Sequence, residues 1–309
     1  MAFLLLDIVK HGTTNQFKKE DPMRIVVAVD GSPCSTSSVK ALAHFTPPEE
    51  LTLVHALHLP DFNYPMITPD LRAEAQEEIK AQLQKEGESI LDEAQEHLPA
   101  NFPHLQRVHQ IGHPVDVIVE TARSARSNLI ILGARGLGPL KELILGSISH
   151  RVLMHAPCST MIVKAPLTQL RKILLPIEGP EDAETALQFL ALQPFRQPVE
   201  VEVFAVWPQP QLSWPTTVGQ SDLMEIQAME EARERMKSVT DRLLQMKFLC
   251  QANVGIGDPA YAILEQAKAS QSDLIMMGTH GRGGFSRFLM GSVSHAVLHQ
   301  TPCPVLIVR

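Results

Sequence analysis

The stretch GARGLGPLKELILGSISH (Gly133–His150) returns later in the chain as GTHGRGGFSRFLMGSVSH (Gly278–His295). Both have the same length, and they belong to a longer repeat in which Asn128–Lys164 aligns with Asp273–Arg309 without a gap. Fifteen of the 37 aligned pairs are identical, whereas average residue usage would give about two or three. A period of 145 residues is too long for a solenoid repeat and has the size of a domain. We therefore predict that the chain is a tandem duplication.

The repeat divides the chain of 309 residues into three predicted parts. Residues 1–22 are expected to be an N-terminal extension, residues 23–165 a first domain and residues 170–309 a second. The boundary between the domains falls in APLTQLR (Ala165–Arg171). With 44% hydrophobic and 20% charged residues, the chain has the composition of an ordinary globular protein.

Composition also limits the expected partners and compartment. The net charge of -7 and the pI near 6.0 give no reason to expect nucleic-acid binding. The four cysteines form no C-x-x-C pair, which argues against a disulfide framework or a thiolate metal site and fits a reducing cytoplasm. The apolar run near the N-terminus is short and is interrupted by Asp7. We expect a soluble, cytoplasmic protein that binds neither nucleic acid nor membranes.

Short apolar runs alternate with segments of helical periodicity in both halves. In Leu71–Leu98, for example, apolar residues recur every three or four positions and Glu and Lys fill the other face, as in a helix. The apolar runs are rich in Val, Ile and Leu, which is typical of strands buried on both faces. They are Ile25–Val29, Leu51–Leu57, Leu129–Leu132, Met161–Val163, Ile173–Ile177, Val199–Val206, Leu274–Met277 and Val305–Val308. The alternation predicts a doubly wound, mainly parallel α/β fold in each half.

Each copy of the repeated stretch connects a predicted strand to a predicted helix, at the edge of the sheet where such folds bind ligands. Its glycines would allow the backbone to approach a ligand closely. Ser147 and Ser292 are expected to be N-caps, at helix ends that offer free N–H groups and partial positive charge. Such donors suit a polyphosphate, so we predict a phosphate-binding loop in each half. The basic side chains that would neutralise phosphate are Arg135, Lys141, His280, Arg282 and Arg287.

Other conspicuous residues have simpler interpretations. His150 and His295 are expected to lie on the helix after each loop, packed or facing solvent. Cys158 and Cys303 precede the last predicted strand of each half, and both are interpreted as small buried side chains. The Glu-rich segment Ala73–Glu96 is interpreted as the solvated face of a helix. We predict no catalytic residue and no metal ligand among them.

With these motifs the chain resembles the universal stress protein family, in its ATP-binding branch. That branch carries glycine, two residues, glycine, nine residues, glycine, and then serine or threonine. The pattern is present as Gly133, Gly136, Gly146 and Ser147, and again as Gly278, Gly281, Gly291 and Ser292. The resemblance covers about Met23–Arg309 and implies two Rossmann-like domains, each with a five-stranded sheet.

The resemblance also implies a ligand and the residues that bind it. An acidic residue that ends the first strand would contact the ribose and adenine side of ATP, and backbone at the end of the second strand would contact the adenine. ATP, or AMP or ADP, is the expected ligand, with Mg²⁺ as an optional companion. The implied set is Asp30, Ala56, Gly133, Arg135, Gly136, Gly146, Ser147 and Ser149 in the first half, and Glu178, Val206, Gly278, Gly281, Gly291, Ser292 and Ser294 in the second.

The second half departs from the family pattern at the sugar end of this site. Glu178 is one methylene longer than Asp30, and Pro180 lacks the N–H and hydroxyl groups that Ser32 offers in the first half. The resemblance further implies that Thr160–Lys164 and Pro304–Arg309 pair antiparallel within the chain as a pseudo-dimer. It leaves open a homodimer of whole chains.

Motifs of related nucleotide chemistry are missing from the sequence. It contains no H-x-G-H signature of adenylyl transfer and no Walker G-x-x-x-x-G-K-[ST], and a fold alone does not imply a reaction. The main hypothesis is a nucleotide-binding stress-response regulator in which any ATP hydrolysis is slow and incidental. The alternatives are an adenylate-using enzyme, such as a hydrolase or adenylyltransferase, and an interaction scaffold that binds no nucleotide.

Overall fold

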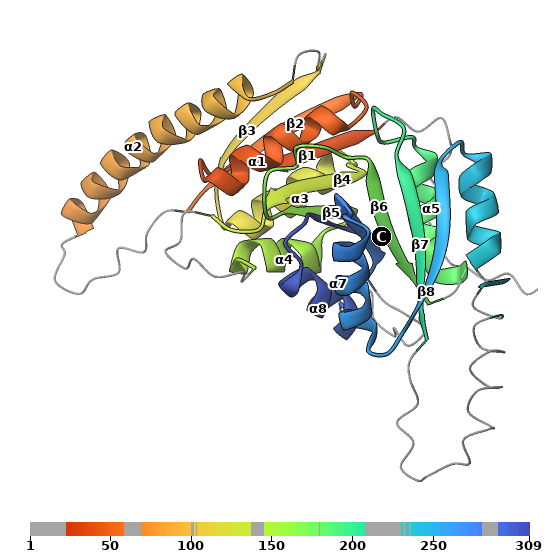
Figure 1. Ribbon diagram of the computed structural model, residues 1–309. Helices are drawn as coiled ribbons and strands as arrows, with labels where there is room; N and C mark the ends of the chain where they lie inside the picture. Colours follow the sequence, from red (N-terminus) through yellow and green to blue (C-terminus); the bar gives the residue numbers. More distant parts are fainter. Residues whose placement is uncertain are drawn as a thin grey trace, which may run out of the picture.

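A computed structural model describes most of the chain outside the predicted N-terminal extension and the middle of each predicted phosphate loop. The described residues are 23–58, 69–99, 102, 104–136, 145–178, 180–207, 230, 233–234, 236–279 and 290–309, with the backbone alone for 69–75 and 180–182. Within them the chain forms one ten-stranded sheet with helices on both faces (Figure 1).

The strand order is β3-β2-β1-β4-β5-β10-β9-β6-β7-β8, so each half contributes five neighbouring strands. In the first half these are β1 (Arg24–Ala28), β2 (Glu50–Leu57), β3 (Leu105–Ile111), β4 (Leu129–Gly133) and β5 (Ser159–Val163). In the second they are β6 (Lys172–Ile177), β7 (Glu200–Trp207), β8 (Leu249–Ile256), β9 (Leu274–Gly278) and β10 (Val305–Val308). Pairing is parallel within each half. This confirms the predicted tandem α/β fold.

Helices cover both faces of the sheet and enclose two apolar clusters. One face carries α1 (Pro33–Ala41), α2 (Pro69–Glu96), α5 (Pro180–Ala191) and the helical segment 236–245, with a short 3₁₀ turn, η1 (Leu42–His44), after α1. The other carries α3 (Pro114–Ser124), α4 (Ser147–His155), α7 (Pro259–Ala269) and α8 (Ser292–Gln300). Pro114 and Pro259 begin their helices, because the first turn needs no N–H from them.

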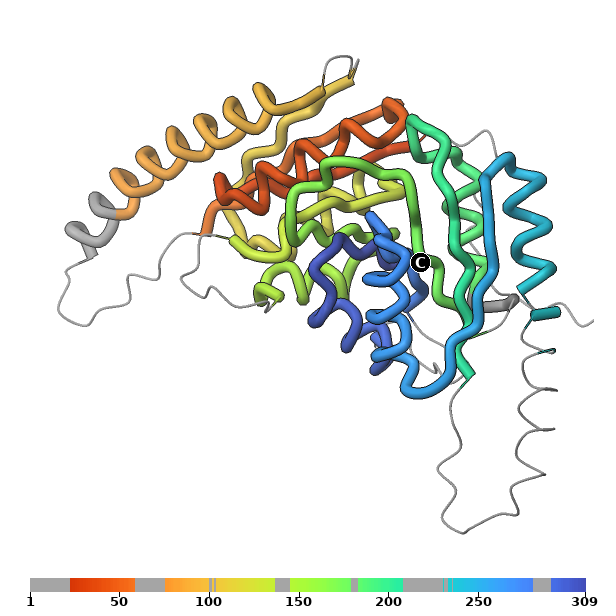
Figure 2. The backbone as a smooth tube through the Cα atoms, in the orientation of Figure 1, coloured from red at the N-terminus to blue at the C-terminus, as the bar shows by residue number. Residues whose placement is uncertain are grey.

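The two halves meet at the centre of the sheet, where the chain also ends (Figure 2). β5 and β10 pair antiparallel there, with Met161 opposite Leu306, which confirms the pairing that the family resemblance implied. Every residue of both strands is buried. A second contact lies on the α1 and α5 face, where the rings of Phe45 and Phe195 have centroids 5.5 Å apart. Each of the two apolar clusters therefore contains residues of both halves.

The outermost strands, β3 and β8, carry a sequence pattern unlike that of the strands between them. β3 reads LQRVHQI and β8 reads LCQANVGI, and neither contains a fully buried residue. Because an edge strand has one unpaired side and borders solvent, it does not need the continuous apolar run of a central strand. β3 and β8 are therefore the two strands that the apolar runs of the sequence did not predict.

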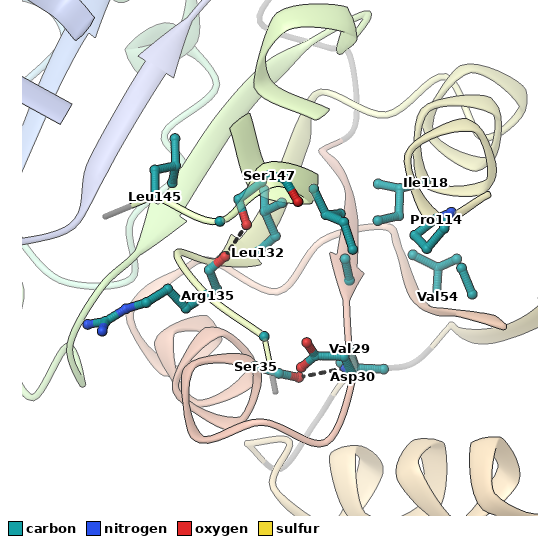
Figure 3. A pocket seen from close by; sticks show the side chains of 17 residues that line it. Val29, Asp30, Ser35, Val54, Pro114, Ile118, Leu132, Arg135, Leu145 and Ser147 are labelled. Carbon is teal, nitrogen blue, oxygen red and sulfur yellow. Dashed lines mark hydrogen bonds between the residues drawn. The ribbon is translucent and has the colours of Figure 1, made fainter. Parts of the chain in front are cut away.

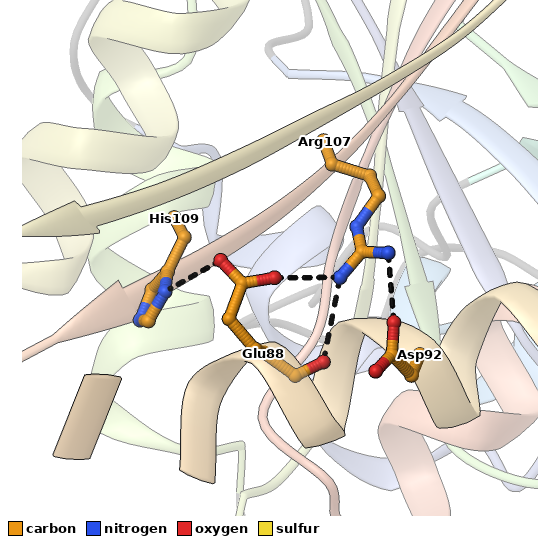
Figure 4. Close-up of polar contacts among 4 residues, drawn as sticks. All are labelled: Glu88, Asp92, Arg107 and His109. Atoms are coloured by element: carbon orange, nitrogen blue, oxygen red, sulfur yellow. Dashed lines mark hydrogen bonds and ion pairs between the residues drawn. The ribbon is translucent and has the colours of Figure 1, made fainter. Parts of the chain in front are cut away.

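Helix α2 packs on β2 and β3 through the C-terminal half of its length, where Leu91 and Ala94 are buried. Arg107 of β3 donates to Glu88 at 2.7 Å and to Asp92 at 2.7 Å (Figure 4). These ion pairs are substantially exposed, so they add little stability and mainly orient the helix. The prediction of a helix with a solvated acidic face in this segment is confirmed.

Candidate functional site

A cavity of about 490 Å³ opens at the carboxyl ends of β1, β2 and β4, where α3 and α4 begin (Figure 3). This is the place at which an open parallel sheet binds ligands, because the strand order reverses between β1 and β4. The eight residues predicted for the first-half site all line the cavity. They are Asp30, Ala56, Gly133, Arg135, Gly136, Gly146, Ser147 and Ser149.

One side of the cavity is the tight turn that joins β1 to α1. Gly31 adopts a φ of 75°, a conformation that favours glycine. The N–H of Ser32 donates to Oδ1 of Asp30 at 3.0 Å, and the N–H of Asp30 donates to the hydroxyl of Ser35 at 3.2 Å. Behind the turn, the buried ring of His55 donates from Nδ1 to the carbonyl of Val29 at 2.7 Å. The carboxylate of Asp30 therefore has a defined position at the cavity wall.

Next to this turn lies the start of the predicted phosphate loop, where glycine is required by close packing. Neither Gly133 nor Gly136 has a positive φ. A Cβ added to Gly133 would lie 2.8 Å from Cβ of Cys34, and one added to Gly136 would collide with the carboxylate of Asp30. The hydroxyl of Ser32 also donates to the carbonyl of Arg135 at 3.3 Å. Loop and turn are thus in direct contact with each other at the cavity wall.

The end of the loop and the start of α4 complete the site. Gly146, with φ -63° and ψ 150°, is the N-cap, and no side chain caps the helix. The expectation that Ser147 is the N-cap was wrong, and Ser292 likewise follows the N-cap Gly291. Both serines are the first helical residues. Because no side chain caps the helix, the N–H groups of its first turn remain available to a ligand in the cavity. The partial positive charge of the helix end also faces the cavity.

The second half repeats the geometry of this helix start. Ser294 donates to the carbonyl of Gly278 at 3.0 Å, as Ser149 does to that of Gly133 at 2.7 Å. The N–H of Gly291 donates to the carbonyl of Thr279 at 2.8 Å, which repeats the bond from Gly146 to Ala134 at 2.7 Å. The predicted residue Gly281, together with Lys141, His280, Arg282 and Arg287, lies outside the described residues.

The remaining predicted residues of the second half lie at the carboxyl ends of its strands. Glu178 directly follows β6, and Val206 is the penultimate residue of β7. They correspond to Asp30, which follows β1, and to Ala56 in β2. The strands thus bring the second set of residues to one edge of the sheet, as they do the first.

Sequence reasoning did not identify the apolar walls of the first-half cavity. These include Val54 on β2, Ile118 on α3 and Leu132 on β4, all of which line it. Their side chains look like ordinary core residues, so nothing in the local sequence distinguishes them. The one available signal concerned Val54 and Leu132, which lie two residues before Ala56 and one residue before Gly133, both predicted site residues.

His150 and His295 lie outside the cavity and meet where α4 and α8 adjoin. Their ring centroids are 6.0 Å apart, and His299 stacks on His295 at 4.3 Å. Burial lowers the pKa of His299, and the nearby charges of His295, Lys164 and His150 act in the same direction. His150 is half-buried and His295 is exposed, and both lie on the helix that follows the loop, in line with the expectation that they pack or face solvent.

The side chains and helices of the described residues bear on metal and membrane binding. These residues contain no group of three or more His, Cys, Asp or Glu side chains that could hold a metal ion. Among their helices, none combines the length and the apolar run that a bilayer crossing requires.

The architecture is that of a tandem Rossmann-like α/β protein, and comparison with known proteins gives its family. The model of the universal stress protein family matches residues 22–164 and again residues 169–309. The chain therefore belongs to the universal stress protein family. This membership supports a role in stress response.

Individual relatives agree with this placement. A universal stress protein of Mycolicibacterium smegmatis is 30% identical over 205 residues, which are 62% of this chain and 64% of the relative, or just under two thirds of its length. The universal stress protein Rv2623 of Mycobacterium tuberculosis is 24% identical over 92% of this chain and 96% of its own. A crystal structure of a universal stress protein from Archaeoglobus fulgidus has the same fold, with a TM-score of 0.57 at 17% identity over 93% of this chain and 96% of its own.

Proposed function

We propose that the first half of this protein binds an adenine nucleotide, and that this nucleotide is ATP or its product AMP or ADP. The protein would act as a stress-response regulator, with its conformation or its choice of partner set by whether the site is occupied. The observation that carries the proposal is the cavity at the β1–β4 switch point. Its volume of about 490 Å³ lies within the range of roughly 300–1,000 Å³ that is usual for small-molecule sites.

The chemistry of the two sides of the cavity supports a definite orientation for the ligand. The start of α4 and the loop from Gly133 to Gly136 would bind the phosphates, because both offer backbone N–H groups and Arg135 adds positive charge. The carboxylate of Asp30 would accept hydrogen bonds from the ribose hydroxyls. The wall formed by Val54 and Ala56 would contact the adenine ring.

A regulator is favoured over an enzyme by what lines the cavity. Among the described lining residues Asp30 is the single carboxylate, and there is no histidine or cysteine to act as a base or nucleophile. We expect any ATP turnover to stay below about one per second, the low end of typical enzymes. Faster turnover with some acceptor would favour the alternative of an adenylate-using enzyme.

Three finer features belong to the same proposal. Mg²⁺ would accompany a bound triphosphate, since it commonly bridges phosphate oxygens and keeps much of its own water shell. The protein would act in the cytoplasm. Whole chains would be able to form a homodimer in addition to the pairing of the two halves within one chain.

Mass spectrometry of the small molecules that leave the freshly purified protein on denaturation tests the proposal. Wild type should release an adenine nucleotide. Gly136→Leu should release none, because the new side chain collides with Asp30 and enters the cavity. Lys40→Leu, which places the same side chain at an exposed position of α1, is the control and should release as much as wild type. Unchanged nucleotide release from Gly136→Leu would refute the site. A wild-type protein that releases no nucleotide and binds none at millimolar ATP would favour the scaffold alternative.

A further inference from the structure

The register of the strands allows the two halves of the sheet to be compared residue by residue. Ala28 of β1 pairs with Val54 of β2 in the fifth row of that strand pair. The fifth row of the corresponding pair in the second half joins Pro176 of β6 to Phe204 of β7. Phe204 therefore occupies the position that Val54 has in the first half.

Val54 and Phe204 also point to the same face of the sheet. Both are buried, at 1% and 3% exposure, in the apolar cluster on the side of α3, α4, α7 and α8. In the first half this position lines the candidate nucleotide cavity. The second half thus has a phenyl ring where the first half has only an isopropyl group.

The ring of Phe204 extends toward the ligand-binding edge of the sheet. A Cβ added to Gly255 of β8 would lie 2.6 Å from Cζ of Phe204 and 3.3 and 3.4 Å from its two Cε atoms. Gly255 pairs with Val206, two residues nearer the carboxyl end than Phe204 itself. The ring therefore leans along the strand over Gly255, and only a glycine leaves room for it there.

Two neighbouring positions also carry larger side chains in the second half than in the first. Val206 corresponds to Ala56, and Pro176 to Ala28, both of which line the first-half cavity. Each replacement adds two carbon atoms. The ladder between β1 and β4 has four residue pairs and reaches Ala28, whereas the ladder between β6 and β9 has two. Pro176, at the position of Ala28, has no N–H with which to extend the shorter ladder.

We propose that the ring of Phe204 fills the space that an adenine ring would need in the second half. Each chain would therefore bind one adenine nucleotide, in its first half. This inference rests on the proposed function of the first-half cavity. The second half keeps the helix start and the serine bonds of a phosphate loop but has no open wall for an adenine ring. The two halves of the pseudo-dimer thus differ in specificity although their backbones match.

Isothermal titration with ATP on the full-length protein, stripped of any nucleotide, separates the two proposals. The expected stoichiometry is one ATP per chain, lost in Gly136→Leu and retained in Gly281→Leu, the sequence-equivalent change in the second half. Two ATP per chain, or one that survives Gly136→Leu, would overturn this inference and leave nucleotide binding intact. No binding at all would instead refute the proposed function.

Opening the second half tests the role assigned to Phe204. The double variant Phe204→Val, Val206→Ala restores the first-half residues at both positions, and its stoichiometry should rise from one toward two. If that variant is unfolded at the temperature of the titration, the double variant Phe204→Leu, Val206→Ala, which removes less side-chain volume, takes its place. A folded variant that still binds one ATP would show that Phe204 does not close the site.

Discussion

Ser32 joins the two sides of the first-half cavity. Its side chain is buried, at 1% exposure, and its hydroxyl accepts from the N–H of Ser35 as the N-cap of α1. The same hydroxyl donates to the carbonyl of Arg135 in the loop at 3.3 Å, and the backbone of Ser32 positions Asp30 at 3.0 Å. One small side chain therefore stabilises a helix and fixes the distance between the turn and the loop.

Ser32→Ala should lower the free energy of unfolding by about 1–2 kcal/mol, because it removes an N-cap and one buried hydrogen bond. ATP affinity should fall at the same time, since the loop loses its link to the turn. Urea denaturation and titration measure the two effects. Ser37→Ala, in the same helix but bonded only to the carbonyl one turn earlier, is the control and should change neither; equal losses in both variants would contradict this role.

Helix α2 shows how one element is fitted to the sheet. Gly87 lies inside this helix, where glycine normally costs about 0.5–1 kcal/mol relative to alanine. A Cβ there would collide with the ring of His109 on β3 and lie 2.9 Å from that of His55 on β2. The glycine thus permits a close approach of α2 to β2 and β3.

Gly87→Leu should destabilise the protein by about 1–3 kcal/mol, the usual effect of overpacking, since both histidine rings would have to move. Ser89→Leu places the same side chain on the exposed face of α2 and should stay within about 0.5 kcal/mol of wild type. Urea denaturation of the two variants gives the comparison. A Gly87→Leu protein as stable as its control would show that α2 can shift freely on the sheet.

The central strands and helices could be predicted from sequence because burial on both faces produces apolar runs, and helical spacing marks one face of α2. The edge strands β3 and β8 could not be listed, because solvent on one side removes that signal. The N-cap of α4 was misplaced by one residue, because serine is the more usual cap and Gly146 leaves this helix end open instead. The glycine spacing located the loop, whereas the collisions that require glycine there depend on Cys34 and Asp30, which are distant in sequence.

The two halves of the molecule are joined where β5 pairs with β10. Lys164 is one of the side chains that contact the other half at this junction. Its ammonium group donates to the carbonyl of Thr301, at the end of α8, at 2.9 Å. Burial lowers the pKa of Lys164 to about 8, and the charge of Arg135 acts in the same direction. A charge at the junction of the two halves is therefore disfavoured in the folded state.

The stability of the whole chain should depend on pH through this residue. Between about pH 8 and pH 10.5 the unfolded chain keeps the Lys164 proton that the folded chain has lost, so the free energy of unfolding rises with pH across this window. Lys164→Met removes that contribution. The difference in unfolding free energy, wild type minus variant, should increase from the lower to the upper end of the window in urea denaturation series. A difference that is flat or falls with pH would contradict the burial of this cation.

A crystal structure of the full chain with a non-hydrolysable ATP analogue examines the nucleotide site itself. We predict one analogue per chain, with its phosphates at Gly136 and the start of α4, its ribose at Asp30 and its adenine against Val54 and Ala56. The ring of Phe204 should stay in place in the second half. Analogue bound elsewhere, or a first-half cavity filled by the protein's own side chains at saturating analogue, would contradict the assignment.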